Sequence, residues 1–320
     1  MSQDDWVRPA TETSLPIWGF RHGIRLGIWP GGFEGGDGGP RGLLRIGYPI
    51  LENGRKHGLI NFIAIEPVVH GQRGFSELET SRVDGQHGKM IYSSQTDDPR
   101  RVSPGEIVTE DGEEVLRVIL RVEPFANGAR PLVVVQFRAK RPNEVWLQAR
   151  AMEGSAPMEY CILTATMGNY ERLRCLWLKD GPVTPQMLWP GFWDDGFTRD
   201  AFIPSEQIPQ DHHGDLVLAA TCNEKDPGAV PPDIRAPWWA YRGSFPVTQY
   251  WRMERGRWRS SVRGRVNARR VYWGGRVPIP GGPAFENMEL VQEFTSDPVF
   301  CFGVTRQEPQ ELGLDFSRRA

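Results

Sequence analysis

A regular alternation of apolar and polar residues is the feature that most limits what this chain can fold into. In EVLRVILRV (114–122) every second residue is Leu or Val, and Arg117 and Arg121 fall between them. Successive side chains of a β-strand point to opposite faces, so this spacing predicts a strand with one buried face and one solvent-exposed face. NEVWLQAR (143–150) has the same period and predicts a second such strand.

Most of the remaining chain has the pattern of further short strands. These runs are rich in Val, Ile, Phe and Thr and end at Gly, Pro, Asn or Asp; they are LINFIAIEP, PLVVVQFR, MEYCILTAT, DLVLAATC, MELVQEF and PVFCFGVT. Only TPQMLWPG and EPQELGLDF favour a helical turn, and the 36 Gly and 27 Pro are too many for long helices. We therefore predict an all-β fold, a large antiparallel β-sandwich with few short helices, in which residues 1–320 form one domain.

The composition is that of an ordinary globular protein and argues against several classes. The chain is 39% hydrophobic and 24% charged, with a formal net charge of -2, so no overall field attracts nucleic acid or an anionic membrane. The four cysteines are widely spaced and include no C-x-x-C pair. Neither a zinc site nor a disulfide framework is expected, and we predict no cofactor and no metal.

The first residues bear on the compartment. MSQDDWVRPATETS is acidic where a secretory signal carries a basic and then an apolar run. No run of about 18 apolar residues occurs anywhere, so no membrane contact is expected. We predict a soluble protein that is cytoplasmic as the sequence stands, and periplasmic or secreted if a signal was removed before residue 1.

The stretch WWAYRGSFPVTQYWR, residues 238–252, mixes aromatic and arginine side chains, with six aromatic residues in fifteen. A sugar ring has an apolar face of C–H groups and a rim of hydroxyls, so aromatic platforms flanked by guanidinium donors suit it. The tryptophans of LWPGFWDDG would add a second platform. The predicted substrate-binding residues are Trp189, Trp193, Trp238, Trp239, Tyr241, Arg242, Tyr250, Trp251 and Arg252. The alternative is that several of these rings fill the core.

The same mixture also suits single-stranded nucleic acid, whose bases stack on aromatic rings while Arg meets phosphate. Between residues 252 and 270 there are eight Arg and one acid, Glu254. The net negative charge of the chain argues against this alternative, because nucleic-acid-binding domains are usually basic. We therefore predict a glycan or oligosaccharide as the partner, with nucleic acid less favoured.

Carboxylates are the first candidates for catalysis, because glycoside hydrolysis usually needs one that is protonated and one that is ionised. Glu66 ends the apolar run LINFIAIEP, and a partly buried carboxyl group suits a general acid. Glu77 and Glu79 lie two residues apart in GFSELE, hence on one face if that segment is extended.

Histidines are the remaining candidate proton carriers. His70 and His87 bracket a segment rich in acidic and basic residues, and DHHGD (211–215) places His212 beside carboxylates. Adjacent histidines in an extended segment point to opposite faces, which argues against a shared metal ion. The candidate catalytic residues are Glu66, Glu77, Glu79, His70, His87, His212 and Glu286.

The chain as a whole resembles one broad group of proteins. A length of 320 residues made almost wholly of strands, scattered His and Glu, and a late FENMELVQEF followed by FCFGVTR are similar to the galactose-mutarotase-like supersandwich proteins. That group includes sugar epimerases and the β-domains of polysaccharide lyases and glycoside hydrolases. The resemblance implies a supersandwich-like fold and carbohydrate chemistry, and Glu286 in AFENMEL occupies a late position like the late Glu of the epimerases.

Two reactions and one binding function follow from these candidates. On a uronate, Arg242 or Arg252 would neutralise the carboxylate while Tyr241, Tyr250 or a histidine removes the neighbouring proton in β-elimination. On a neutral glycan, a pair of the carboxyl groups would hydrolyse the glycosidic bond, with Glu66 as the acid. We predict a carbohydrate-active enzyme, either a glycoside hydrolase or a polysaccharide lyase, and the alternative is a non-catalytic carbohydrate-binding protein.

Overall fold

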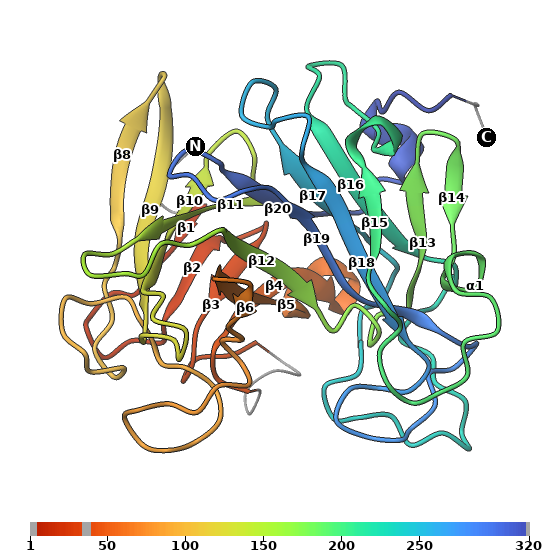
Figure 1. The fold of residues 1–320 in the computed structure, drawn as a ribbon, viewed down its shortest axis with the longest axis horizontal. Coiled ribbons are helices and arrows are strands. Elements are labelled where there is room, and N and C mark those ends of the chain that lie inside the picture. Colours follow the sequence, from red (N-terminus) through yellow and green to blue (C-terminus); the bar gives the residue numbers. More distant parts are fainter. Residues whose placement is uncertain (1–4, 34–39, 318–320) are drawn as a thin grey trace.

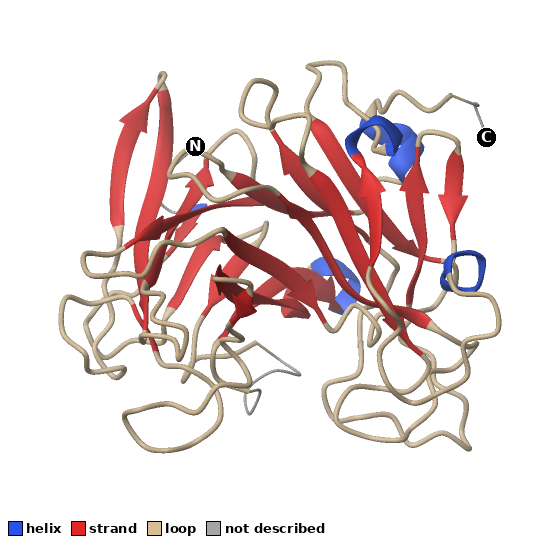
Figure 2. Ribbon diagram, viewed as in Figure 1, coloured by secondary structure: helices blue, strands red, loops and turns tan. Residues whose placement is uncertain are grey.

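The computed structural model describes residues 5–33 and 40–317 (Figure 1). Strands make up the body of the molecule, and the helices are short turns (Figure 2). These helices are η2 (Glu52–Gly54), α1 (Pro185–Leu188), η3 (Ser205–Gln207) and η4 (Pro309–Leu312). In the described part of the chain, none of them has the length and apolar character needed to cross a membrane.

The described strands form two antiparallel sheets of ten strands each, here named sheet A and sheet B. The strands of sheet A, in spatial order, are β1 (Trp6–Val7), β2 (Ile17–Phe20), β3 (Arg25–Gly27), β4 (Leu43–Leu51), β5 (Lys56–Val69), β12 (Tyr160–Thr166), β19 (Ala284–Val291), β18 (Arg263–Arg269) and β15 (Ala201–Pro204), with β6 (Gln72–Arg73) paired to β5. The strands of sheet B are β14 (Gly181–Val183), β13 (Leu173–Leu178), β16 (Leu216–Cys222), β17 (Thr248–Met253), β20 (Phe300–Thr305), β11 (Glu144–Ala151), β10 (Pro131–Arg138), β9 (Glu113–Val122) and β7 (Ile91–Tyr92), with β8 (Glu106–Glu110) paired to β9.

The predicted all-β fold is confirmed, because the alternating runs are the strands. The Leu and Val side chains of EVLRVILRV are buried in β9, whereas Ile119 is exposed and the two arginines are partly exposed on the other face. The two predicted helical turns also form, as α1 and η4. β11 departs from simple alternation, since Trp146 on its outer face is also buried, beneath the guanidinium groups of Arg138 and Arg252.

Both sheets contain strands from each half of the chain. The first half supplies β1–β6 to sheet A and β7–β11 to sheet B, and the strands from β12 onward complete both. The halves meet where β5 pairs with β12 and where β11 pairs with β20 (Figure 1). We call these two junctions the seams. One hydrophobic cluster extends from Trp6 to Val304 and so includes residues of both halves.

A buried ion cluster crosses the seam of sheet B. Arg252 on β17 donates from Nη2 to Glu144 Oε2 at 2.6 Å and from Nε to Glu144 Oε1 at 3.2 Å, while its Nη1 donates to Asp215. Tyr250 also donates its hydroxyl to Glu144 Oε1, at 3.0 Å. Gly303 of β20 lies beneath this tyrosine ring, and a Cβ there would be 2.0 Å from Tyr250 Cζ. Glycine therefore allows the ring to cross β20 and reach β11.

Removing Glu144 should reveal how much this cluster contributes to stability. Glu144→Ala removes the carboxylate that accepts two hydrogen bonds from the buried Arg252 guanidinium. We therefore expect the free energy of unfolding, measured by urea denaturation, to fall by about 3–5 kcal/mol. Adding Arg252→Met should recover part of the loss, because an apolar side chain needs no partner there. A double variant as unstable as the sum of the two single variants would contradict this account.

Candidate functional site

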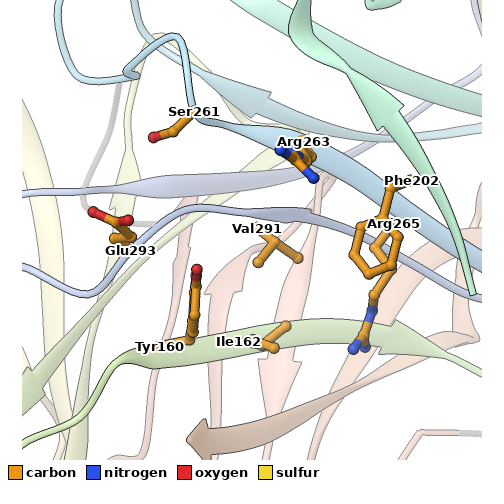
Figure 3. A pocket seen from close by; sticks show the side chains of 8 residues that line it. All are labelled: Tyr160, Ile162, Phe202, Ser261, Arg263, Arg265, Val291 and Glu293. Carbon is orange, nitrogen blue, oxygen red and sulfur yellow. The ribbon is translucent and has the colours of Figure 1, made fainter. Parts of the chain in front are cut away.

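The outer face of sheet A, which points away from sheet B, carries a pocket of about 390 Å³ that we call the Arg263 pocket. Its lining residues are Tyr160, Ile162, Phe202, Ser261, Arg263, Arg265, Val291 and Glu293. Figure 3 shows Ile162 and Val291 in the centre, with Tyr160, Ser261 and Glu293 on one side and the two arginines on the other. The pocket therefore combines an apolar floor with hydroxyl, guanidinium and carboxylate groups.

Strand register places these side chains on one face. The cross-strand pairs are Ile162 with Glu66, Arg263 with Val291, and Arg265 with Glu289. Leu163, Val266 and Leu290, which alternate with them, belong to the hydrophobic core. The two-residue period of the strands thus sends apolar side chains inward and leaves a polar set outside.

A buried ion cluster forms one wall of the Arg263 pocket and crosses the seam of sheet A. Arg265 is 4% exposed, and its Nε donates to Glu289 Oε1. Its Nη2 lies 3.5 Å from Glu66 Oε2. Glu66 also accepts from Arg73 Nε at 2.9 Å and from Thr164 Oγ1 at 2.8 Å. We call these five residues the Glu66–Arg265 cluster.

Burial raises the pKa of two carboxyl groups at this cluster. Desolvation raises the pKa of Glu289 to about 8, with the charge of Glu66 acting in the same direction. Glu289 Oε1 accepts from Arg265, and Glu289 Oε2 is buried without a hydrogen-bond partner. Desolvation, and then the charge of Glu66, raises the pKa of Glu77 to about 7. Carboxyl groups that keep a proton near neutral pH are the kind that general acid catalysis requires.

A second pocket, of about 370 Å³, lies at the other end of β18, and we call it the Trp193 pocket. Trp189 and Trp193 both line it, together with the polar side chains of Gln186, Thr198 and Arg270. The Trp193 side chain is 76% exposed, and Arg270 donates to its carbonyl oxygen. Trp189 packs edge-on against the core residue Phe285, with ring centroids 6.3 Å apart. The indole of Trp189 is therefore packed against the core, and the indole of Trp193 is open to solvent.

The stretch 238–252 does not form the open aromatic surface that the sequence predicts. Its buried side chains are Trp239, Tyr241, Tyr250, Trp251 and Arg252, whereas Trp238 and Arg242 are exposed. Trp251 donates its indole N–H to Met288 O at 2.7 Å, inside the core. Trp239, Tyr241 and Trp251 belong to the hydrophobic core. Tyr250 and Arg252 lie on the outer face of sheet B, where both donate to Glu144.

The segment after Glu66 separates the two glutamates that the sequence places on one face. Residues 75–79 form a turn, closed by a hydrogen bond from Glu79 N to Phe75 O at 3.0 Å, so the segment is not extended. Glu77 lies close enough to Glu66 for the charge of Glu66 to raise its pKa, whereas Glu79 pairs with Lys89 at 3.1 Å. His70 and His87 are exposed, and neither lines the Arg263 pocket or the Trp193 pocket.

The two remaining catalytic candidates lie elsewhere. Glu286 is buried at a bulge of β19, where desolvation raises its pKa to about 8 and neither carboxyl oxygen has a hydrogen-bond partner. His212 lines a third pocket, of about 280 Å³, on the outer face of sheet B, with His213, Tyr250 and Arg252. Of the predicted catalytic residues, only Glu66 and Glu77 are therefore brought together.

Arg263, Arg265 and Glu289 are not among the site residues predicted from the sequence. One signal for them is present in the sequence: RGRVNAR (263–269) alternates, and so places three arginines on one face of a strand. Glu289 stands between Met288 and Leu290 in the same way. Two charged side chains on the outer face of a sheet can pair only where the strand order makes them neighbours, and strand order is what the sequence does not reveal.

Known proteins add no further constraint on the site. No protein-family model matches this chain, and neither a curated protein nor a solved structure matches it. The residues of the two pockets and of the Glu66–Arg265 cluster are therefore the basis for the function proposed below.

The buried carboxyl group of Glu289 predicts a specific pH dependence of stability. The native state keeps this proton between the ordinary pKa of 4.5 and about 8, and the unfolded chain does not. The stability that this group contributes is complete below the ordinary pKa and is lost as the pH rises through about 8. The Glu289→Gln side chain cannot ionise. From about pH 5 to about pH 9, the free energy of unfolding of the wild type should therefore fall relative to that of Glu289→Gln by more than about 1.4 kcal/mol, the equivalent of one pKa unit.

Urea unfolding at a series of pH values measures this gain. Glu293→Gln is the matched control, because Glu293 is exposed and follows the same strand. A stability difference between wild type and Glu289→Gln that stays constant with pH would count against a protonated Glu289.

Proposed function

We propose that the protein binds a saccharide on the outer face of sheet A, with the Trp193 pocket as its aromatic platform. The observation that carries this proposal is the pairing of Trp189 and Trp193 around one pocket, with Trp193 open to solvent. An exposed indole presents a flat apolar surface to the C–H face of a sugar ring. Gln186, Thr198 and Arg270 supply donors and acceptors for the hydroxyl rim.

Binding fits the geometry better than hydrolysis does. Glycoside hydrolysis needs two carboxyl groups on either side of the scissile bond. Glu289 and Glu286 are buried, and the Arg263 pocket has one carboxylate in its lining, Glu293. The Glu66–Arg265 cluster acts on a ligand through the guanidinium of Arg265, which does line the pocket.

A panel of neutral and acidic oligosaccharides, screened by titration calorimetry against the purified protein, tests the proposal. We expect at least one to bind, and Trp193→Ala to weaken it by about tenfold or more, as the loss of a sugar-stacking ring would. Trp238→Ala is the matched control, since Trp238 is 49% exposed and lies outside both pockets. Equal effects of the two substitutions, or no binding across the panel, would refute the proposal.

A second candidate, β-elimination on a uronate, is favoured by the chemistry of the Arg263 pocket. Tyr160, Arg263 and Arg265 line the same pocket. A guanidinium that neutralises the uronate carboxylate acidifies the neighbouring C–H, and the Tyr160 oxygen would take that proton. The electron pair of the broken C–H bond then forms the sugar double bond as the glycosidic C–O bond breaks, and Tyr160 passes the proton that it removed to the leaving oxygen.

Elimination leaves an unsaturated sugar that absorbs in the ultraviolet. For this candidate we expect absorbance to grow when the protein is incubated with uronate-containing oligosaccharides, and Tyr160→Phe to abolish the growth while leaving binding within about twofold. New reducing ends without ultraviolet absorbance would instead indicate hydrolysis, and neither signal would leave the protein as a binder.

A further inference from the structure

We propose that the Arg263 pocket and the Trp193 pocket are the two ends of one groove, and that its ligand is an oligosaccharide chain rather than a single sugar. This inference rests on the proposed function and adds to it the size and path of the ligand. The oligosaccharide lies along β18 and across residues 193–202, a segment that we call the strip.

The two pockets lie at opposite ends of one strand. Arg263, the first residue of β18, lines one pocket, and Arg270, directly after its last residue, lines the other. A strand rises about 3.3 Å per residue, so the pockets are about 20 Å apart. That separation is larger than one sugar ring, and a ligand that fills both pockets must be a chain of several units.

An exposed aromatic strip joins the two ends. In the described part of the chain, three of the four exposed aromatic side chains fall between residues 193 and 202. Trp193 lines one pocket and Phe202 the other, and Phe197 lies between them in the sequence. Phe197 and Phe202 are 46% and 53% exposed. Exposed aromatic residues gathered in one segment are typical of a binding surface rather than of ordinary solvent-exposed chain.

Hydrogen bonds hold this strip alongside β18. Ala268 N donates to Thr198 Oγ1 at 2.9 Å, and Asn267 Nδ2 donates to Asp200 Oδ1 at 3.1 Å. Near Trp193, the guanidinium of Arg269 lies over the Phe197 ring, 4.7 Å from its centroid. The rings are therefore positioned along the strand rather than scattered over a loose loop.

The chemistry between the rings favours a saccharide over an apolar partner. Asp195, Arg199 and Asp200 are exposed along the strip, so a charged or hydroxyl-binding group accompanies each aromatic residue. A chain of sugars alternates apolar ring faces with hydroxyl rims, which matches aromatic rings interleaved with donors and acceptors. A purely apolar partner would leave these charged groups desolvated and unpaired.

Calorimetry with oligosaccharides of increasing length, taken from the series that binds in the panel above, tests the groove. We expect affinity to rise with chain length and then to level off once both pockets are filled. Phe197→Ala should weaken the longest ligand by about tenfold and leave the shortest binder unchanged, because Phe197 does not line the Trp193 pocket and only a ligand that extends beyond that pocket reaches it. Ile119→Ala is the control, since Ile119 is 48% exposed on β9 of sheet B.

The outcomes separate the two proposals. If short saccharides bind through Trp193 and neither added length nor Phe197→Ala changes the affinity, the single groove is refuted while saccharide binding stands. If no saccharide of any length binds, both proposals are overturned. A loss of affinity on Phe197→Ala that is equal for short and long ligands would also contradict the groove, because it would place the short ligand on Phe197.

Discussion

Buried guanidinium groups join the two halves of the chain, and the position of the candidate site depends on them. At the seam of sheet B, Arg252 reaches Glu144 across β20. At the seam of sheet A, Arg265 reaches Glu66 across β19 and β12. A buried charge is costly unless it is paired and hydrogen-bonded, so each arginine specifies which strands must be neighbours. The two halves are thus held in one relative position by four oppositely charged side chains as well as by their shared core.

A polar connection between the sheets supplements these clusters. Asn61 of β5 donates to Gln249 of β17 at 2.7 Å, and Gln249 in turn donates to Glu171. Burial raises the pKa of Glu171 well above its usual range. Sheet A and sheet B are therefore linked at a defined register near the seams. The Arg263 pocket lies against one seam, where the Arg265 guanidinium forms its wall, and so its shape depends on the same contacts that orient the two halves.

The sequence revealed the strands and little of the site, for a physical reason. Alternation is local, so β9 and β10 could be read directly from it, and Thr184 followed by Pro185 marked the start of α1. The partners of Glu66 are not local, because Arg265 reaches it only through the strand order of sheet A. Composition also misled the reading of residues 238–252, since Trp and Tyr serve equally in cores and in binding surfaces. Trp189 and Trp193 came together because they lie close in the chain, within one loop beside β18.

We propose that ligand binding belongs to the outer face of sheet A, between the two pockets. Nitrogen-15 NMR of the labelled protein, titrated with the longest oligosaccharide that binds, identifies the face that the ligand occupies. The account predicts the largest shift changes at the indole N–H groups of Trp189 and Trp193 and at the amides near Arg263, with the indole of Trp238 unmoved. Shifts confined to Trp238, or to the amides around His212 on sheet B, would contradict it.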